Sequence, residues 1–214
     1  RIHLNNPAYE GADARKLIDL AAGRPEVAKY GDDPVIGFAG ASYGGAVSFL
    51  AAGLDPRVDA IVPAFTWHSL RQALFPQHQV AGVAESPADV NPANRRGVFK
   101  QRWASLLFSN AGEPPAPTDQ ASTRTDGLCG RFDPQLCRGY LAAAETGEAD
   151  DELSNLLDES GLEKVVPAIK APTLIIWGRQ DRTCTFEIGL NSLNIISNSQ
   201  LVVIREASHW VPFE

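Results

Sequence analysis

The sequence predicts an α/β fold with a mostly parallel sheet. Four short apolar runs have the length and composition of buried strands: residues 35–39, 58–63, 173–177 and 200–204. Helical stretches at 45–54 and 186–196 alternate with them, which is the order of strand–helix–strand units. Because the run at 35–39 is apolar throughout, we expect its strand to be covered on both faces.

The sequence before the first strand predicts a helix and an open sheet edge. Residues 6–22 place Tyr9, Leu17 and Ile18 among the apolar positions of an amphipathic surface helix. No strand is recognisable before residue 35, so N-terminal strands of the sheet are expected to be missing from this chain. A hydrophobic edge left in this way pairs readily, and we expect a second copy, a partner segment or residues preceding Arg1 to cover it.

Composition narrows the class of partner. The 214 residues contain 44% hydrophobic and 21% charged residues, which suits one globular domain. The net charge of -7 and the lack of basic clusters argue against a nucleic-acid or anionic-membrane surface. The uncharged stretch 34–54 contains five glycines, which argue against membrane insertion. We expect a soluble protein, secreted or cytoplasmic, whose partner is a small molecule or a peptide.

A helical insertion is predicted between the two parts of the sheet. Residues 65–165 lose the strand–helix alternation, and prolines separate short helical pieces such as 97–108 and 135–145. We interpret 65–165 as a cap, with residues 1–64 and 166–214 as the core.

Three side chains of the predicted cap are candidates for the substrate pocket. Trp67 and Trp103 could line it, although most apolar side chains of such a segment form its own packing core. His68 comes just after a strand, from which it could reach the site.

The three cysteines leave two readings open. Cys129 and Cys137 could form a small disulfide loop in an exported protein, or they could be two buried thiols; Cys184 is left over. Their spacing fits neither a Cys-x-x-Cys redox pair nor a common zinc site. We expect no metal and no cofactor.

The candidate nucleophile is Ser42. Residues 40–44 read Gly-Ala-Ser-Tyr-Gly, between a predicted strand and a predicted helix. A strand–turn–helix elbow holds a serine exposed and strained, as a nucleophile requires, whereas an isolated match of this kind often marks only a glycine-rich turn. We expect side chains at Gly40 and Gly44 to collide with the neighbouring strand and helix.

An acid and a base follow in the expected order. Asp181 comes after the third predicted strand and His209 after the fourth, so both should lie at the rim that carries Ser42. His209 would take the Ser42 proton and Asp181 would orient the imidazole. Taken separately, Asp181 could be a turn residue and His209 a surface histidine. Competing acids are less well placed: Asp133, Asp158 and Glu206.

The oxyanion needs backbone donors as well. The N–H of Tyr43, the residue after the nucleophile, is one candidate. The second normally comes from a loop after an earlier strand, and no such strand is recognisable here.

Several segments resemble known serine hydrolases. Residues 6–11, 33–45 and 55–63, followed by Trp67-His68-Ser69-Leu70 and residues 129–147, resemble the X-prolyl dipeptidyl aminopeptidase and cocaine esterase-like enzymes of the α/β-hydrolase superfamily. The resemblance implies an α/β-hydrolase fold, Ser42 as nucleophile and Asp181 as acid, with a second oxyanion donor from a tyrosine that would precede Arg1. Residues 169–182 and 208–214 look more like the meta-cleavage product hydrolases.

The sequence therefore predicts a serine hydrolase that cleaves an ester or an X-Pro peptide bond through an acyl-enzyme. One alternative is hydrolysis of carbon–carbon or simple carboxylic ester bonds, which the C-terminal likeness suggests. Another is a catalytically silent binding or assembly module.

Overall fold

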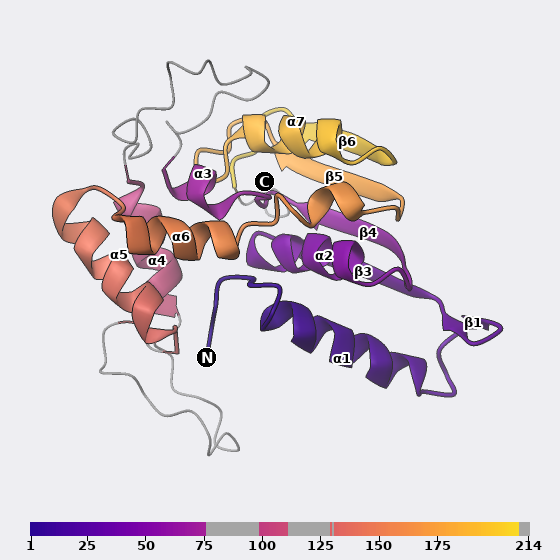
Figure 1. Ribbon diagram of the computed structural model, residues 1–214. Coiled ribbons are helices and arrows are strands. Elements are labelled where there is room, and N and C mark those ends of the chain that lie inside the picture. The colour runs from indigo at the N-terminus through magenta and orange to yellow at the C-terminus, as the bar shows by residue number, and fades with distance from the viewer. Residues whose placement is uncertain (76–98, 111–128, 130, 210–214) are drawn as a thin grey trace, which may run out of the picture.

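The computed structural model describes residues 1–75, 99–110, 129 and 131–209. Its centre is a four-stranded parallel sheet in the order β3-β4-β5-β6 (Figure 1). The strands are β3 (Ile36–Ala41), β4 (Val58–Ala64), β5 (Thr173–Gly178) and β6 (Ser199–Ile204). Each overlaps one of the four predicted strands, and the predicted α/β fold is confirmed.

Two helices form the core against the sheet. Helix α2 (Tyr43–Leu54) packs on β3 and β4, and α7 (Phe186–Ile195) packs on β5 and β6. Phe49 of α2 and Trp177 of β5 are fully buried in this layer. The short 3-10 helix η3 (Val166–Ala168) contacts both helices and leads into β5.

Helix α1 (Glu10–Ala22) is shorter than the predicted 6–22. The residues before it form a turn, in which the Glu10 carboxylate accepts hydrogen bonds from the N–H groups of His3 and Asn6. The helix buries Ala14 and Ile18 and packs on α2, but Leu17 is 62% exposed. The prediction that Leu17 belongs to the packed face is therefore wrong.

One face of the sheet is open within the described part of the chain. A row of residues crosses all four strands there, and its members are exposed or half-buried: Ala41, Ala64, Ile176 and Val202. In β3, Gly37 and Ala39 are exposed as well. The prediction that the first strand is covered on both faces is wrong, because an apolar run reports the chemistry of a strand and not what lies over it.

Strand β3 lies at the edge of this sheet. Two short strands precede it, β1 (Lys29–Tyr30) and β2 (Asp33–Pro34), but they pair only with each other. The expectation that a second copy, a partner segment or preceding residues cover the edge stays a prediction.

Four helices gather beyond the carboxyl ends of the strands (Figure 1). They are α3 (Leu70–Leu74), α4 (Gln101–Asn110), α5 (Pro134–Thr146) and α6 (Asp151–Glu159). As expected, most apolar side chains here are core: Leu70, Leu74, Phe75 and Phe108 are all buried. The assignment of 65–165 as a separate cap stays a prediction.

Cys129 and Cys137 form a disulfide, with their Cα atoms 5.7 Å apart, and Cys184 is free and buried. The disulfide lies beside Phe132, whose N–H donates to the Cys129 carbonyl. Phe132 pairs with Ile2 and so attaches the N-terminal residues to this region.

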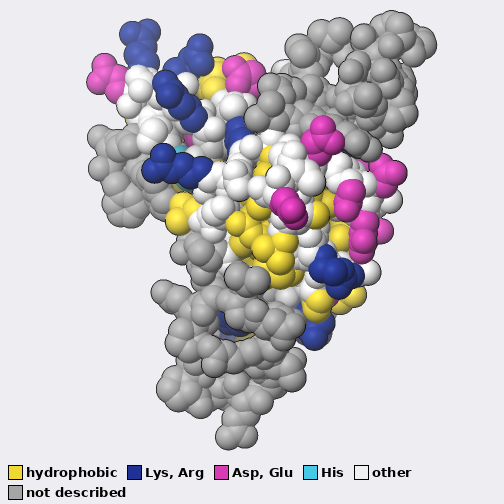
Figure 2. All heavy atoms as spheres, turned by 90° about the vertical axis from the view of Figure 1, so that its left-hand side faces the viewer, with side chains coloured by type: hydrophobic (Ala, Val, Ile, Leu, Met, Phe, Trp, Pro, Cys, Tyr) yellow, Lys and Arg dark blue, Asp and Glu magenta, His cyan; other side chains and the backbone are white. Residues whose placement is uncertain are grey.

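On the side of the molecule that carries α5 and α6, hydrophobic side chains lie between a mainly acidic flank and a mainly basic one (Figure 2). No helix in the described ranges is long and apolar enough to span a membrane.

Candidate active site

Ser42 lies at a sharp turn between β3 and α2. Its φ is 51° and its ψ is -117°, a conformation that costs energy in any residue with a side chain. Two hydrogen bonds from the end of β4 hold the turn: Ser42 N–H donates to the Ala64 carbonyl at 2.9 Å, and Thr66 Oγ1 donates to the Ser42 carbonyl at 2.6 Å. The strain is thus fixed by the neighbouring strand.

The glycines of the turn have separate roles. A Cβ at Gly40 would overlap the carbonyl of Gly44, as predicted for the first glycine. A Cβ at Gly44 would meet no atom within 4 Å, so the predicted collision there is wrong. Gly45 is the second restricted position, because a Cβ there would lie 2.8 Å from Cβ of Thr66. The close approach of α2 to β4 therefore falls one residue later than predicted.

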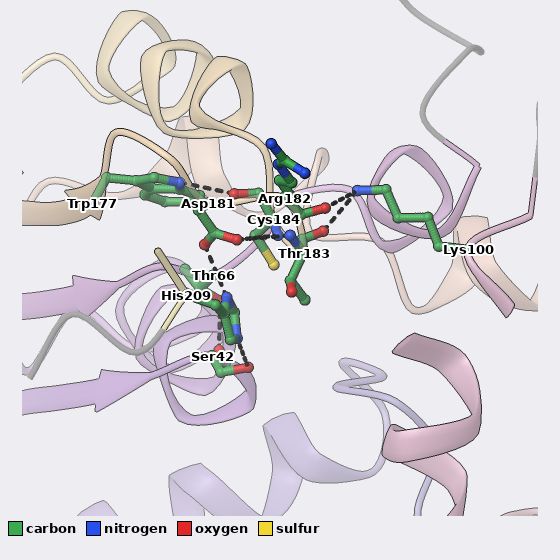
Figure 3. Close-up of polar contacts among 9 residues, drawn as sticks. All are labelled: Ser42, Thr66, Lys100, Trp177, Asp181, Arg182, Thr183, Cys184 and His209. Carbon is green, nitrogen blue, oxygen red and sulfur yellow. Dashed lines mark hydrogen bonds and ion pairs between the residues drawn. The ribbon is translucent and has the colours of Figure 1, made fainter. Parts of the chain in front are cut away.

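The structure brings Ser42, Asp181 and His209 together (Figure 3). His209 Nε2 lies 3.2 Å from Ser42 Oγ, and His209 Nδ1 lies 2.8 Å from Asp181 Oδ2. Asp181 follows β5 and His209 follows β6, so parallel strands deliver all three side chains to one rim of the sheet. The Asp181 side chain is fully buried.

Asp181 uses both carboxylate oxygens. Oδ1 accepts the backbone N–H groups of Thr183 at 2.8 Å and Cys184 at 2.9 Å, while Oδ2 faces His209. An ionised carboxylate only accepts hydrogen bonds, so His209 Nδ1 must be the protonated nitrogen of the neutral ring. The lone pair of Nε2 then faces the Ser42 hydroxyl at 3.2 Å.

The loop that carries Asp181 and the loop that carries His209 support each other. Gln180 N–H donates to the Ala207 carbonyl at 3.0 Å, and Arg179 N–H donates to the Ile204 carbonyl at 2.9 Å. The Cys184 carbonyl accepts Trp177 Nε1–H at 2.9 Å, which anchors the far end of the Asp181 loop to β5. Asp181 and His209 therefore belong to one hydrogen-bonded unit.

Three residues around the site were not predicted from the sequence. Thr66 holds the elbow, and the ring of Phe65 packs edge-on against His209 with ring centres 5.0 Å apart. Lys100 donates from Nζ to the carbonyls of Arg182 at 3.0 Å and Thr183 at 2.8 Å. Desolvation lowers the pKa of Lys100 from its ordinary value, against the attraction of the Asp181 and Glu187 carboxylates. Only the position of Phe65 and Thr66 directly after the strand β4, which pairs with β3, could have indicated them.

Tyr43 is the first residue of α2, so its N–H has no carbonyl partner within the helix. Its side chain points elsewhere: the hydroxyl accepts Asn5 N–H at 3.0 Å, and burial, reinforced by Glu10, raises its pKa. The ring stands edge-on to Trp67, which in turn stands edge-on to Trp103. Trp67 is fully buried and Trp103 half-buried, and their role in a substrate pocket stays a prediction.

His68 contacts α7 and no member of the Ser42–His209–Asp181 group in the contacts described. Its Nδ1 lies 3.2 Å from Oγ of Ser192, which itself donates to the Ile188 carbonyl and therefore accepts from the imidazole. Burial lowers the pKa of His68 to about 4, so the ring is neutral at pH 7. Among the residues described, no group of three or more His, Cys, Asp or Glu side chains could hold a metal ion.

The parallel sheet with a strained serine between strand and helix defines the α/β-hydrolase class. The model of the X-Pro dipeptidyl-peptidase (S15) family matches residues 8–210. The chain belongs to this family.

Other proteins are similar over shorter stretches or in fold alone. A 2-hydroxy-6-oxononadienedioate/2-hydroxy-6-oxononatrienedioate hydrolase of Escherichia coli K12 is 46% identical over 46 residues, which are 22% of this chain and 16% of that protein. Acetyl xylan esterase 1 from Thermoanaerobacterium has a TM-score of 0.53 at 17% identity, covering 92% of this chain and 46% of the esterase. A 2,6-dihydroxy-pseudo-oxynicotine hydrolase has a TM-score of 0.55 at 17% identity, covering 96% of this chain and 41% of that one. The chain spans less than half the length of each of these three proteins.

Proposed function

We propose that this protein is a serine hydrolase that cleaves an ester or an X-Pro peptide bond through an acyl-enzyme. One observation carries the proposal: an unbroken line of hydrogen bonds from the buried Asp181 through His209 to the strained Ser42. Membership of a hydrolase family agrees with it.

Ser42, His209 and Asp181 each have a defined part in the proposed reaction. His209 Nε2 accepts the Ser42 proton as Oγ bonds to the substrate's carbonyl carbon, and it returns that proton to the leaving group when the carbonyl–heteroatom bond breaks. Water then attacks the acyl-enzyme with His209 again as base. Asp181 keeps the proton on Nδ1 and stabilises the imidazolium. The Tyr43 N–H donates to the oxyanion, and Trp103, half-buried in the first turn of α4, is our candidate for contact with the acyl group.

A fluorophosphonate probe tests the nucleophile. We expect the folded protein to be labelled, Ser42→Ala to be unlabelled with turnover at least about 1000-fold lower, and Ser154→Ala on α6 to behave as the wild type. Labelling that is equal in the wild type and Ser42→Ala would end the hydrolase proposal and favour a silent binding or assembly module.

A substrate panel tests the bond that is cleaved. We expect hydrolysis of p-nitrophenyl esters, and cleavage of X-Pro-p-nitroanilides alone would assign a peptidase instead. A second candidate is carbon–carbon bond hydrolysis, which only the 46-residue match to the E. coli hydrolase favours. Turnover of 2-hydroxy-6-oxononadienedioate without ester hydrolysis would select it.

A further inference from the structure

Lys100 binds the loop that carries Asp181. Its Nζ donates to two consecutive backbone carbonyls, those of Arg182 at 3.0 Å and Thr183 at 2.8 Å. Lys100 itself lies directly before α4, where its N–H donates to the Leu74 carbonyl at 2.9 Å. The contact therefore joins the start of α4 to the loop that carries Asp181.

The two peptide groups that Lys100 binds are the same two that bind Asp181 (Figure 3). The first joins Arg182 to Thr183: its carbonyl accepts from Lys100, and its N–H donates to Asp181 Oδ1. The second joins Thr183 to Cys184 and makes the same pair of contacts. Two peptide groups therefore lie side by side between an ammonium and a carboxylate.

This order is electrostatically favourable at every step. A peptide group has a dipole of about 3.5 D with its positive end at N–H, so each dipole points its positive end at Asp181 and its negative end at Lys100. Hydrogen bonds in such a chain polarise one another, most strongly away from water. The lowered pKa of Lys100 agrees with a partly desolvated ammonium.

We propose that Lys100 is a positioning residue for the acid of the triad, acting on Asp181 through these two peptide groups; the inference rests on the proposed function. With the loop held, Asp181 Oδ1 is fixed by two N–H groups and Oδ2 is aimed at His209. Without the ammonium, both carbonyls lose a charged partner and the loop can rotate Oδ2 away from the imidazole.

A double-mutant cycle separates this role from a general structural one. We expect Lys100→Met to lower kcat by about 10- to 100-fold with KM changed less than about twofold, because a small misplacement of a catalytic group costs about this much. Lys100→Arg should recover most of the loss, and Lys170→Met, at an exposed lysine, should have no effect. In an Asp181→Asn background, Lys100→Met should cost less than about twofold. Equal losses in both backgrounds would overturn the proposal. If Lys100→Met does not fold, Lys100→Gln enters the same cycle.

A second readout does not depend on turnover. The proton on His209 Nδ1 is expected to give a far-downfield NMR signal through its bond to Asp181. We expect Lys100→Met to move or broaden this signal, while Lys100→Arg and Lys170→Met retain it. An unchanged signal in Lys100→Met would refute the positioning role. A Lys100-dependent signal in a protein without turnover would refute only the hydrolase proposal.

Discussion

Replacing Asp181 with asparagine should abolish most turnover by reversing the proton on His209. Oδ1 accepts two backbone N–H groups, so the carboxamide oxygen of the variant would stay there and its NH2 would face His209 Nδ1. The ring must then accept at Nδ1 and protonate Nε2, which leaves no lone pair for the Ser42 proton. The Oδ2 to Nδ1 distance of 2.8 Å leaves no space for a water to relieve the mismatch.

We expect kcat for an activated ester to fall by about 10⁴-fold, or about 5.5 kcal/mol in activation free energy, as in other triads with the wrong tautomer. The assay compares wild type, Asp181→Asn and Glu206→Gln, with the melting temperature of each as a check on folding. Glu206 is the matched control, since it is an exposed carboxylate three residues before His209. A loss below tenfold in Asp181→Asn, or an equal loss in Glu206→Gln, would refute the assignment.

Two further predictions concern the fold around the site. The pKa of His68 is about 4 in the folded protein and 6.5 when the side chain is exposed, so the neutral buried ring keeps its full contribution to the free energy of unfolding above pH 6.5 and loses it as the pH falls toward 4. Denaturant titrations should therefore show that acid lowers the free energy of unfolding by about 3 kcal/mol less in His68→Gln than in the wild type. An equal loss in both proteins would contradict the burial argument. A Cβ at Gly178 would overlap the carbonyls of Ala207 and Ser208, so Gly178→Ala should lower kcat at least tenfold and destabilise by about 1–3 kcal/mol. Gly37→Ala, whose nearest contact is 3.5 Å, is its control, and similar losses in both variants would refute the steric reading.

The strands and the order of the site residues could be predicted because both depend on short stretches of local sequence. An apolar run bounded by turn residues marks a strand, and parallel strands bring their carboxyl ends to one edge whatever lies between them. Asp181 and His209 could therefore be placed at the rim of Ser42 without knowledge of the strand order. Gly44 was misjudged because the motif does not indicate which glycine approaches β4; that depends on how α2 leaves the elbow.

Contacts between distant segments could not be predicted in this way. Lys100 has no motif and belongs to a stretch whose pattern indicates only a helix start. Its partners are main-chain carbonyls, which carry no sequence signal at all. The open face of the sheet escaped prediction for a related reason: Ala41 and Val202 look like core residues in sequence, and only the absence of a covering element in the described structure exposes them.

The site consists of two units with different supports. Ser42 is held by β4 through Ala64 and Thr66, whereas Asp181 and His209 are held by each other's loops and by Lys100. The distance of 3.2 Å between Ser42 Oγ and His209 Nε2 is longer than the 2.8 Å between His209 Nδ1 and Asp181 Oδ2. Movement of α4 would therefore displace Asp181 and His209 together and leave Ser42 in place. Because Trp103 lies on α4 one turn after Lys100, a substrate that contacts Trp103 would act on the helix whose start is bound to the loop of Asp181.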